Sequence, residues 1–198
     1  MKTSNIDYQF TLNSLVETLA SILGWHNVDE GHGERTAIPA LRIATKLNGG
    51  ERLDEEQLLL LDYAARLHDL GRIAISDDLI TKPGNFTTAE RGAMETHPQI
   101  GYNFLSRSKL PPEITLTILY HHEHFDGSGY PKGLKGLDIP LFARIVTIAD
   151  TWDALTSDRP YRKAMLSAAA LNVMAVNSSW FDPRLYTIFL DIRREAGS

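Results

Sequence analysis

Two segments that lie far apart in this chain carry the side chains best suited to chemistry. Residues 121–131 read HHEHFDGSGYP, and the pair His68-Asp69 ends an apolar, helix-like run. Adjacent histidines followed by a glycine-rich turn suit an apolar core poorly, whereas imidazole and carboxylate together suit first-row metals such as iron, manganese or zinc. The two segments therefore predict an active site with more than one metal ion.

The carboxylates set the geometry that such a site would need. Asp69 is the candidate bridging ligand, because its two oxygens can contact two ions, and His68 would contact one of them. Asp150 is the one carboxylate in an otherwise apolar helical turn, where a buried charge needs a partner. The other candidate ligands all carry an imidazole side chain: His32, His97, His121 and His122.

Each candidate also has a purely structural interpretation. An isolated histidine is more often a surface or hydrogen-bonded core residue, and Asp69 could merely lie at a helix end. Asp150 could pair with Arg144 or Arg159, and the pair His121-His122 would suit the dipole at a helix C-terminus. The set as a whole favours the ligand interpretation, while no single member does.

Composition bounds the kind of protein. The 198 residues are 43% hydrophobic and 23% charged, which is typical of a globular chain of one domain. The net charge of -5 argues against a long nucleic acid as partner, since backbone phosphates attract lysine and arginine. There is no cysteine, no apolar run of about 18 residues and no secretory signal, so we expect a cytoplasmic protein without membrane contact.

Hydrophobic periodicity predicts helices and no strands. Asp54 is a suitable N-cap, Thr87 to Glu90 form a capping-box pattern, and Pro39 should kink or split the helix that follows His32. We expect an all-α single compact bundle of about seven or eight helices, with residues 1–30 as a packing or dimerising appendage to a domain at 31–198. Periodic segments lie at 11–24, 37–47, 54–67, 168–176 and 185–195. Further helices are expected to begin near 88, 98, 111 and 140.

Taken in order, these motifs resemble those of the HD-GYP family, a branch of the HD metal-dependent phosphohydrolase superfamily. The resemblance runs from about residue 30 to about residue 190, which is nearly the whole chain. The segments that carry it are His32-Gly33-Glu34-Arg35, His68-Asp69-Leu70-Gly71-Arg72, His97-Pro98-Gln99-Ile100-Gly101, His121-His122-Glu123, Asp126-Gly127-Ser128-Gly129-Tyr130-Pro131, Ala149 to Leu155, and Arg159-Pro160-Tyr161-Arg162.

The resemblance implies an HD-domain-like fold and an enzyme that hydrolyses cyclic di-GMP. A hydroxide that bridges two metal ions would open the ring to linear pGpG, and a second cut would give GMP. Two divalent ions, iron or manganese, are the implied cofactors. Carried over by position, one ion would be held by His32, His68, Asp69 and Asp150, and the other by Asp69, His97, His121 and His122.

The resemblance also implies how the substrate is held. Arg159 and Arg162 match phosphate-holding cations, and a guanidinium can grip two phosphate oxygens at once. Tyr130, in the Gly-Tyr-Pro turn, would present an aromatic or hydroxyl surface to the substrate. Asp153 is expected to orient a ligand or an arginine, whereas His124 matches no ligand position.

Two positions depart from the family pattern. Some members bind a third metal through a glutamate that stands where this chain has Val28, so we expect two metals here. Arg72 replaces the usual lysine and is implied as a catalytic residue beside Asp69. Arginine is a poor acid, so Arg72 would bind phosphate but slow turnover, or it would simply cap the helix end.

Three functions remain open at this point. The first is a phosphodiesterase of cyclic di-GMP or of a related cyclic dinucleotide such as cGAMP. The second is a weakly active or inactive module that works through contacts with signalling proteins or as a homodimer. The third is an HD hydrolase of mononucleotides, for which the Gly-Tyr-Pro turn would be incidental.

Overall fold

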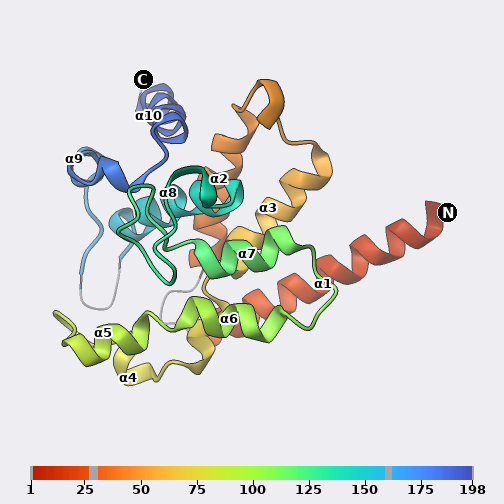
Figure 1. Cartoon of the computed structure of the whole chain (residues 1–198), viewed down its shortest axis with the longest axis horizontal. Helices are drawn as coiled ribbons and strands as arrows, with labels where there is room; N and C mark the ends of the chain where they lie inside the picture. Colours follow the sequence, from red (N-terminus) through yellow and green to blue (C-terminus); the bar gives the residue numbers. More distant parts are fainter. Residues whose placement is uncertain (1, 27–30, 159–161, 198) are drawn as a thin grey trace.

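The structure is a computed structural model that describes residues 2–26, 31–158 and 162–197, with side chains at 10–23, 31–158 and 162–196. Helices form all of its extended regular elements, and no β-strand is present in these ranges, which confirms the all-α expectation (Figure 1). The α-helices are α1 (Lys2–His26), α2 (His32–Thr45), α3 (Glu55–Leu67), α4 (Asp77–Ile80), α5 (Thr88–Met94), α6 (His97–Leu105), α7 (Pro112–Tyr120), α8 (Leu141–Thr156), α9 (Ser167–Val176) and α10 (Pro183–Gly197). The 3-10 helices are η1 (Gly49–Glu51), η2 (Leu70–Ala74), η3 (Gly136–Asp138) and η4 (Ser178–Trp180).

Local sequence signals fix several helix starts. Asp54 and Gln57 form a capping box at α3, in which Gln57 N donates to Asp54 Oδ1 at 2.8 Å. Thr87 and Glu90 do the same at α5, where Thr87 N donates to Glu90 Oε2 at 2.8 Å. Asp54 was predicted as an N-cap and Thr87 to Glu90 as a capping box, whereas the contribution of Gln57 at α3 was not predicted. The four-residue α4 adds to the expected elements, since so short a helix has no detectable periodicity.

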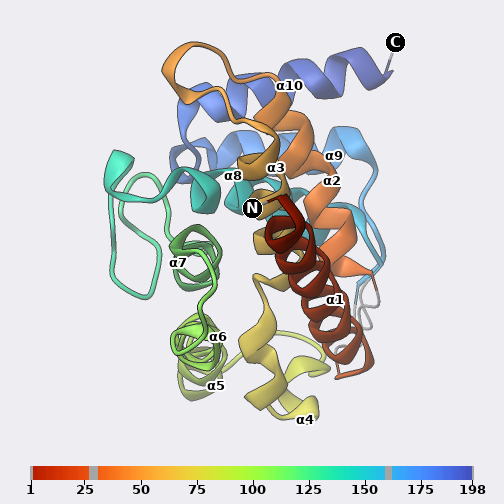
Figure 2. The ribbon, with the colours of Figure 1, turned by 90° about the vertical axis from the view of Figure 1, so that its right-hand side faces the viewer.

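Two apolar clusters share α3 and form the core. The first joins α3 to α2, α8, α9 and α10, and its largest fully buried side chains include Phe181 and Phe189. The second joins α3 to α1, η2, α6 and α7 around Tyr63 and Ile118. Figure 2 shows α9 and α10 at one end of the molecule and α4 and α5 at the other, with α3 between them. The two apolar clusters therefore meet along α3.

The helix α2 continues through Pro39, so of the expected kink or split at this proline the split is wrong, whereas the kink stays a prediction. Proline removes one backbone hydrogen bond from a helix, but packing can offset that loss. Ala37, Ala40 and Ile43 are all at most 1% exposed and lie in the first cluster. Tertiary burial on α3 and α8 thus holds the helix together on both sides of the proline.

The first helix is both part of the core and an extension from it. Leu12 and Val16 are buried in the second cluster, whereas the N-terminal end of α1 reaches away from the other helices (Figure 1). The division into an appendage at 1–30 and a domain at 31–198 stays a prediction. Among the described residues, no helix combines the length and the apolar character needed to cross a membrane.

The backbones of η2 and α6 approach each other closely at Gly71. A Cβ atom on Gly71 would stand 1.9 Å from the carbonyl oxygen of His97 and 2.6 Å from the amide nitrogen of Gly101. Only glycine fits a contact of this kind, because backbone atoms cannot move aside as a flexible side chain can. Gly71 therefore sets the distance between the segment after His68 and the start of α6.

We predict that Gly71→Ala destabilises the fold by about 3 kcal/mol, since the added methyl group must push two backbone segments apart. Gly92→Ala is the matched control, because nothing lies within 4 Å of its Cβ position on α5. Alanine at that exposed helical position should stabilise the protein by about 0.5–1 kcal/mol. Urea unfolding of both variants measures the two effects, and equal midpoints would contradict the close approach.

Candidate metal centre

Helix ends deliver most of the candidate ligands to one place. His32 is the first residue of α2, and His97 is the first residue of α6. His68 and His121 are the residues that directly follow α3 and α7, and Asp150 comes from the interior of α8. Backbone groups at helix ends lack some intrahelical partners, so side chains at these positions can be held by local hydrogen bonds.

One group of candidate ligands joins α2, α3 and α8. The donor atoms of His32, His68 and Asp150 lie within 4.8 Å of one another. Asp150 Oδ1 is 3.2 Å from His32 Nε2 and 3.7 Å from His68 Nε2. Two donors that bind one ion at about 2.1 Å are roughly 3.0–3.4 Å apart, so this spacing suits a single cation between them.

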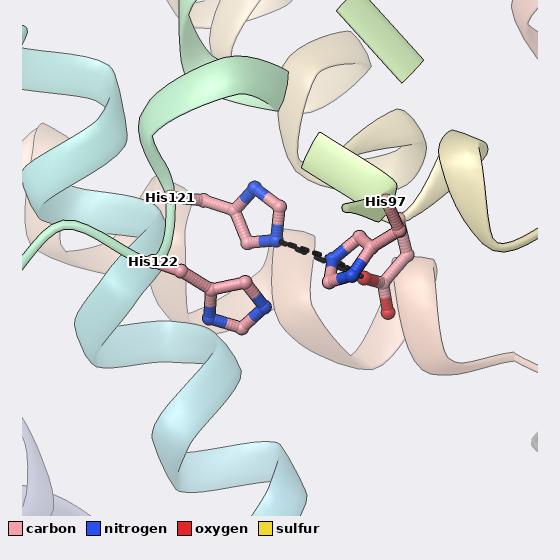
Figure 3. A group of neighbouring side chains, drawn as sticks. His97, His121 and His122 are labelled. Carbon is pink, nitrogen blue, oxygen red and sulfur yellow. Dashed lines mark hydrogen bonds and ion pairs between the residues drawn. The ribbon is translucent and has the colours of Figure 1, made fainter. Parts of the chain in front are cut away.

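The second group joins the α3–η2 junction to α6 and α7. Its members are Asp69, His97, His121 and His122, whose donor atoms also lie within 4.8 Å of one another. His97 Nε2 is 3.1 Å from Asp69 Oδ1 and 3.4 Å from His121 Nε2. Figure 3 shows the rings of His97, His121 and His122 turned toward a common space.

Asp69 connects the two groups. Its Oδ1 faces His97 at 3.1 Å, and its Oδ2 faces His32 at 3.4 Å and His68 at 3.5 Å. The residue is 1% exposed, so both oxygens are removed from bulk water. This is the geometry that a carboxylate needs in order to contact two cations, one through each oxygen.

Hydrogen bonds fix the orientation of four imidazoles. The Nδ1 atoms of His68, His97 and His121 lie 2.7, 2.7 and 2.9 Å from the carbonyl oxygens three residues earlier. His32 Nδ1 lies 2.7 Å from Asp153 Oδ2. A carbonyl or carboxylate oxygen only accepts, so each Nδ1 carries the proton and Nε2 is left to bind a ligand.

Two buried nitrogen atoms test whether the residues fit a metal. His68 Nε2 and His122 Nε2 are both inaccessible to water, and neither has a hydrogen-bond partner among the described residues. A buried polar atom without a partner is costly, and most have one in native proteins. Bound cations would satisfy both nitrogens, so the donor set fits two metal ions.

The charges within the cluster are arranged for ligation. Burial would raise the pKa of Asp69, but the charges of Arg72 and then His68 hold it well below its ordinary value. Burial lowers the pKa of His121 to about 4, and it lowers the pKa of His122 strongly too. At neutral pH this leaves Asp69 ionised and His121 and His122 neutral, which are the forms that bind cations. Burial would lower the pKa of His32, but its contacts with Asp150, Asp153 and Asp69 raise that pKa well above its ordinary value, so a bound cation would take the place of a proton there.

Asp153 contacts one candidate ligand, His32, and one arginine, Arg35. Besides His32, it accepts a hydrogen bond from Arg35 Nε at 2.7 Å and from the hydroxyl of Ser157 at 2.7 Å. Arg35 was part of the motif that starts at His32, but its role could not be assigned from sequence. Arg35 lies one helical turn after His32 and so steadies the carboxylate that His32 contacts.

The glycine-rich loop folds back onto the centre. The Tyr130 ring stacks on the His122 ring, with centroids 4.7 Å apart. Burial, and then the charge of Asp69, raise the pKa of Tyr130 far above its ordinary value, so it remains a neutral phenol. Glu123, which sequence reasoning missed, is 1% exposed and accepts hydrogen bonds from the amides of Lys132 and Leu134.

The arginines expected around the substrate lie in different settings. Arg72 Nε is 3.0 Å from Asp69 Oδ2, which places its charge at the shared carboxylate. Arg162 donates to the carbonyl oxygens of Ala154 and Leu155 near the end of α8, so its guanidinium is engaged with backbone. Arg159 lies outside the described residues.

Arg144 and His124 make their contacts away from the candidate ligands. Arg144 does not contact Asp150 but forms an ion pair with the buried Asp182. His124 stacks on Trp180 and is not part of either ligand group. The segment 27–30, which contains Val28 and thus bears on a third metal, lies outside the described residues.

Comparison with known proteins identifies the family. The model of the HD domain family matches residues 16–185, and the chain belongs to this family. The chain is 49% identical over 135 residues to the cyclic di-GMP phosphodiesterase response regulator RpfG of Xanthomonas campestris pv. campestris, covering 67% of this chain and 36% of the relative. It is 35% identical over 96% of its length to a cyclic di-GMP phosphodiesterase of Thermotoga maritima, of which it covers 51%.

Further relatives share the fold or carry related names. The 3'3'-cGAMP-specific phosphodiesterase 2 of Vibrio cholerae is 35% identical over 94% of this chain and 36% of its own length. The solved structure of Bd1817, an HDG"Y"P protein from Bdellovibrio bacteriovorus, has a TM-score of 0.68 and 23% identity over 82% of this chain and 51% of that one. These matches confirm the family resemblance that the motifs indicated. The chain spans about half or less of the length of these relatives.

We predict that His122→Ala reduces the metal content from about two ions per chain to about one, because it removes a donor from the second group. His124→Ala is the matched control two residues away, and it should leave the content unchanged. Elemental analysis of the purified variants gives the number directly. Equal metal content in the two variants would contradict the assignment of His122 as a ligand.

We predict that Asp153→Asn weakens metal binding about 10–100-fold, because His32 loses the carboxylate that fixes its tautomer. Asp191→Asn serves as control, since Asp191 pairs with the exposed Arg194 on the same helix, away from the candidate ligands. Calorimetric titration of the metal-free protein with manganese(II) measures both. An unchanged affinity in Asp153→Asn would show that this hydrogen bond does not support a ligand.

Proposed function

We propose that this protein is a binuclear metal-dependent phosphodiesterase that hydrolyses cyclic di-GMP to linear pGpG. The observation that carries the proposal is the position of Asp69, whose two oxygens face two separate groups of imidazoles. A buried carboxylate with nitrogen donors on both sides is suited to two cations only a few ångströms apart. That arrangement serves in-line hydrolysis of phosphate esters.

The named activities of the relatives support the choice of substrate. Two of them, from Xanthomonas campestris and Thermotoga maritima, are cyclic di-GMP phosphodiesterases, and one from Vibrio cholerae acts on 3'3'-cGAMP. Cyclic di-GMP is the first candidate here, and cGAMP shares its chemistry closely enough to be the second. Iron or manganese is the proposed metal, because imidazole and carboxylate suit both.

The chain's own residues would prepare the reaction. When bound, two divalent cations supply a nucleophilic water at neutral pH and stabilise the charge that builds on the phosphoryl oxygens. His32, His68 and Asp150 would hold one cation, and the second group would hold the other. Asp69 would belong to both sites, because its Oδ1 faces His97 and its Oδ2 faces His32. Because Nδ1 hydrogen bonds preset four of the imidazoles, the site needs little reorganisation when the substrate binds.

Arg72 is proposed to act next to this centre. Its guanidinium keeps Asp69 ionised, and it lies close enough to the shared carboxylate to meet a phosphate bound there. Since arginine does not give up its proton, Arg72 stabilises charge and does not protonate the leaving oxygen. Arg159 and Arg162 remain proposed substrate contacts, and Arg162 must leave its carbonyl partners to reach a phosphate.

A second function is favoured by the same contact of Arg72. If Arg72 stays paired with Asp69 Oδ2, its positive charge repels a cation at that oxygen and weakens metal binding there. The protein would then bind metal weakly and act through protein contacts, as a nearly inactive module. Metal affinity separates the two functions, because only the enzyme requires both ions at full occupancy.

We predict that the manganese- or iron-loaded protein converts cyclic di-GMP to pGpG, and that Asp69→Asn abolishes this conversion by removing a charge shared by both ions. Chromatographic separation of the nucleotides over time measures the reaction. Cyclic di-GMP, 3'3'-cGAMP and a mononucleotide are compared at equal concentration, and the cyclic dinucleotides should react faster.

His124→Ala is the control for this assay, because its ring lies outside both ligand groups and should leave the rate unchanged. Absence of any linear product with two metal ions bound per chain would refute the phosphodiesterase proposal. Faster turnover of the mononucleotide than of either cyclic dinucleotide would instead support a general HD hydrolase.

A further inference from the structure

One of the five imidazoles in the centre is held differently from the rest. His32, His68, His97 and His121 each have a hydrogen bond at Nδ1 that fixes the ring. His122 makes no such side-chain hydrogen bond within the described part of the chain. A histidine ligand normally relies on this second contact for its tautomer and orientation. Something else must therefore hold the His122 ring in place.

Aromatic contacts surround the His122 ring. Tyr130 is stacked on it with centroids 4.7 Å apart and planes inclined by 27°. His97 meets it edge-on at 5.1 Å, and His121 lies tilted against it at 4.1 Å. Since His97 and His121 are themselves proposed ligands of the same ion, Tyr130 is the ring contact that comes from outside the ligand set.

The loop that carries Tyr130 is built onto the backbone next to His122. The Tyr130 amide donates to the carbonyl oxygen of His122 at 3.1 Å. A Cβ atom on Gly129 would stand 2.4 Å from that same carbonyl oxygen and 2.3 Å from the amide nitrogen of His124, so glycine is required for this approach. Glu123 holds the far side of the loop through Lys132 and Leu134. The loop thus places Tyr130 on His122 by contacts to residues 122–124.

We propose that the Tyr130 ring positions His122 as a metal ligand, by stacking in place of the missing hydrogen bond. Tyr130 is then a positioning residue of the metal centre, and the Gly-Tyr-Pro turn is part of how that centre is built. This inference rests on the proposed binuclear site. It differs from the expectation that Tyr130 contacts the substrate, because a positioning ring acts before any nucleotide is present.

Manganese(II) alone, without nucleotide, is the probe that separates these roles. Calorimetric titration of the metal-free protein should resolve two binding events in the wild-type chain. In Tyr130→Ala one of the two should weaken about 10–100-fold, as when a ligand loses its supporting contact. Tyr130→Phe keeps the stacking face and should bind both ions within about threefold of wild type. His122→Ala should lose the same event that Tyr130→Ala weakens.

Further variants keep the test decisive. Ser128→Ala, in the same loop but exposed and, among the described residues, bonded to His124 and Asp126 alone, should leave both events unchanged. Thermal unfolding of the metal-free variants shows whether each is folded. If Tyr130→Ala does not fold, Tyr130→Leu takes its place in the test. Its manganese affinity at the weakened event should be at least threefold lower than in wild type.

The outcomes distinguish this inference from the proposed function. Two tight binding events in wild type that persist unchanged in Tyr130→Ala, or in Tyr130→Leu, would overturn the positioning role and leave the binuclear site intact. An equal loss in Tyr130→Phe and Tyr130→Ala would overturn it too, because the hydroxyl and not the ring face would then matter. A wild-type chain that binds fewer than two ions would overturn the proposed function and this inference together.

Discussion

The buried carboxylate of Asp69 imposes the constraint on which the centre of this fold depends. A charge removed from water is costly unless it meets opposite charge or hydrogen-bond donors, and Asp69 is 1% exposed. Imidazoles from α2, α3, α6 and α7 and the guanidinium of Arg72 surround it. The four α-helices and the 3-10 helix η2, which carries Arg72, must therefore end or pass within a few ångströms of one side chain. The close approach at Gly71 and the shared position of α3 in both apolar clusters serve that arrangement.

The ligands are secured by two kinds of support. Three histidines bond the carbonyl oxygen three residues earlier, so their orientation follows from the C-terminal ends of α3, α5 and α7. His32 depends instead on Asp153, which is 121 residues away, and His122 on the loop that carries Tyr130. The three locally held candidate ligands need only the turn of chain that directly precedes them. The orientation of His32 also depends on the position of α8, and that of His122 on the position of the Tyr130 loop.

Sequence reasoning could predict much of this because its strongest signals are local. Periodicity located most helices, the caps at Asp54 and Thr87 follow from residue type and spacing, and the order of the motifs pointed to the candidate ligands that the structure brings together. The three-dimensional contacts were out of reach. Nothing local shows which oxygen of Asp69 faces which group, that α2 continues through Pro39, or that Glu123 pins a loop. Each of these depends on elements that are distant in the chain.

The central claim is that Asp69 joins two ions, and electron paramagnetic resonance of the protein loaded with two equivalents of manganese(II) tests it most directly. Two ions that share a carboxylate interact magnetically, so the spectrum should show a spin-coupled pair that is lost in Asp69→Asn. A spectrum of isolated, uncoupled manganese at full occupancy would contradict the account.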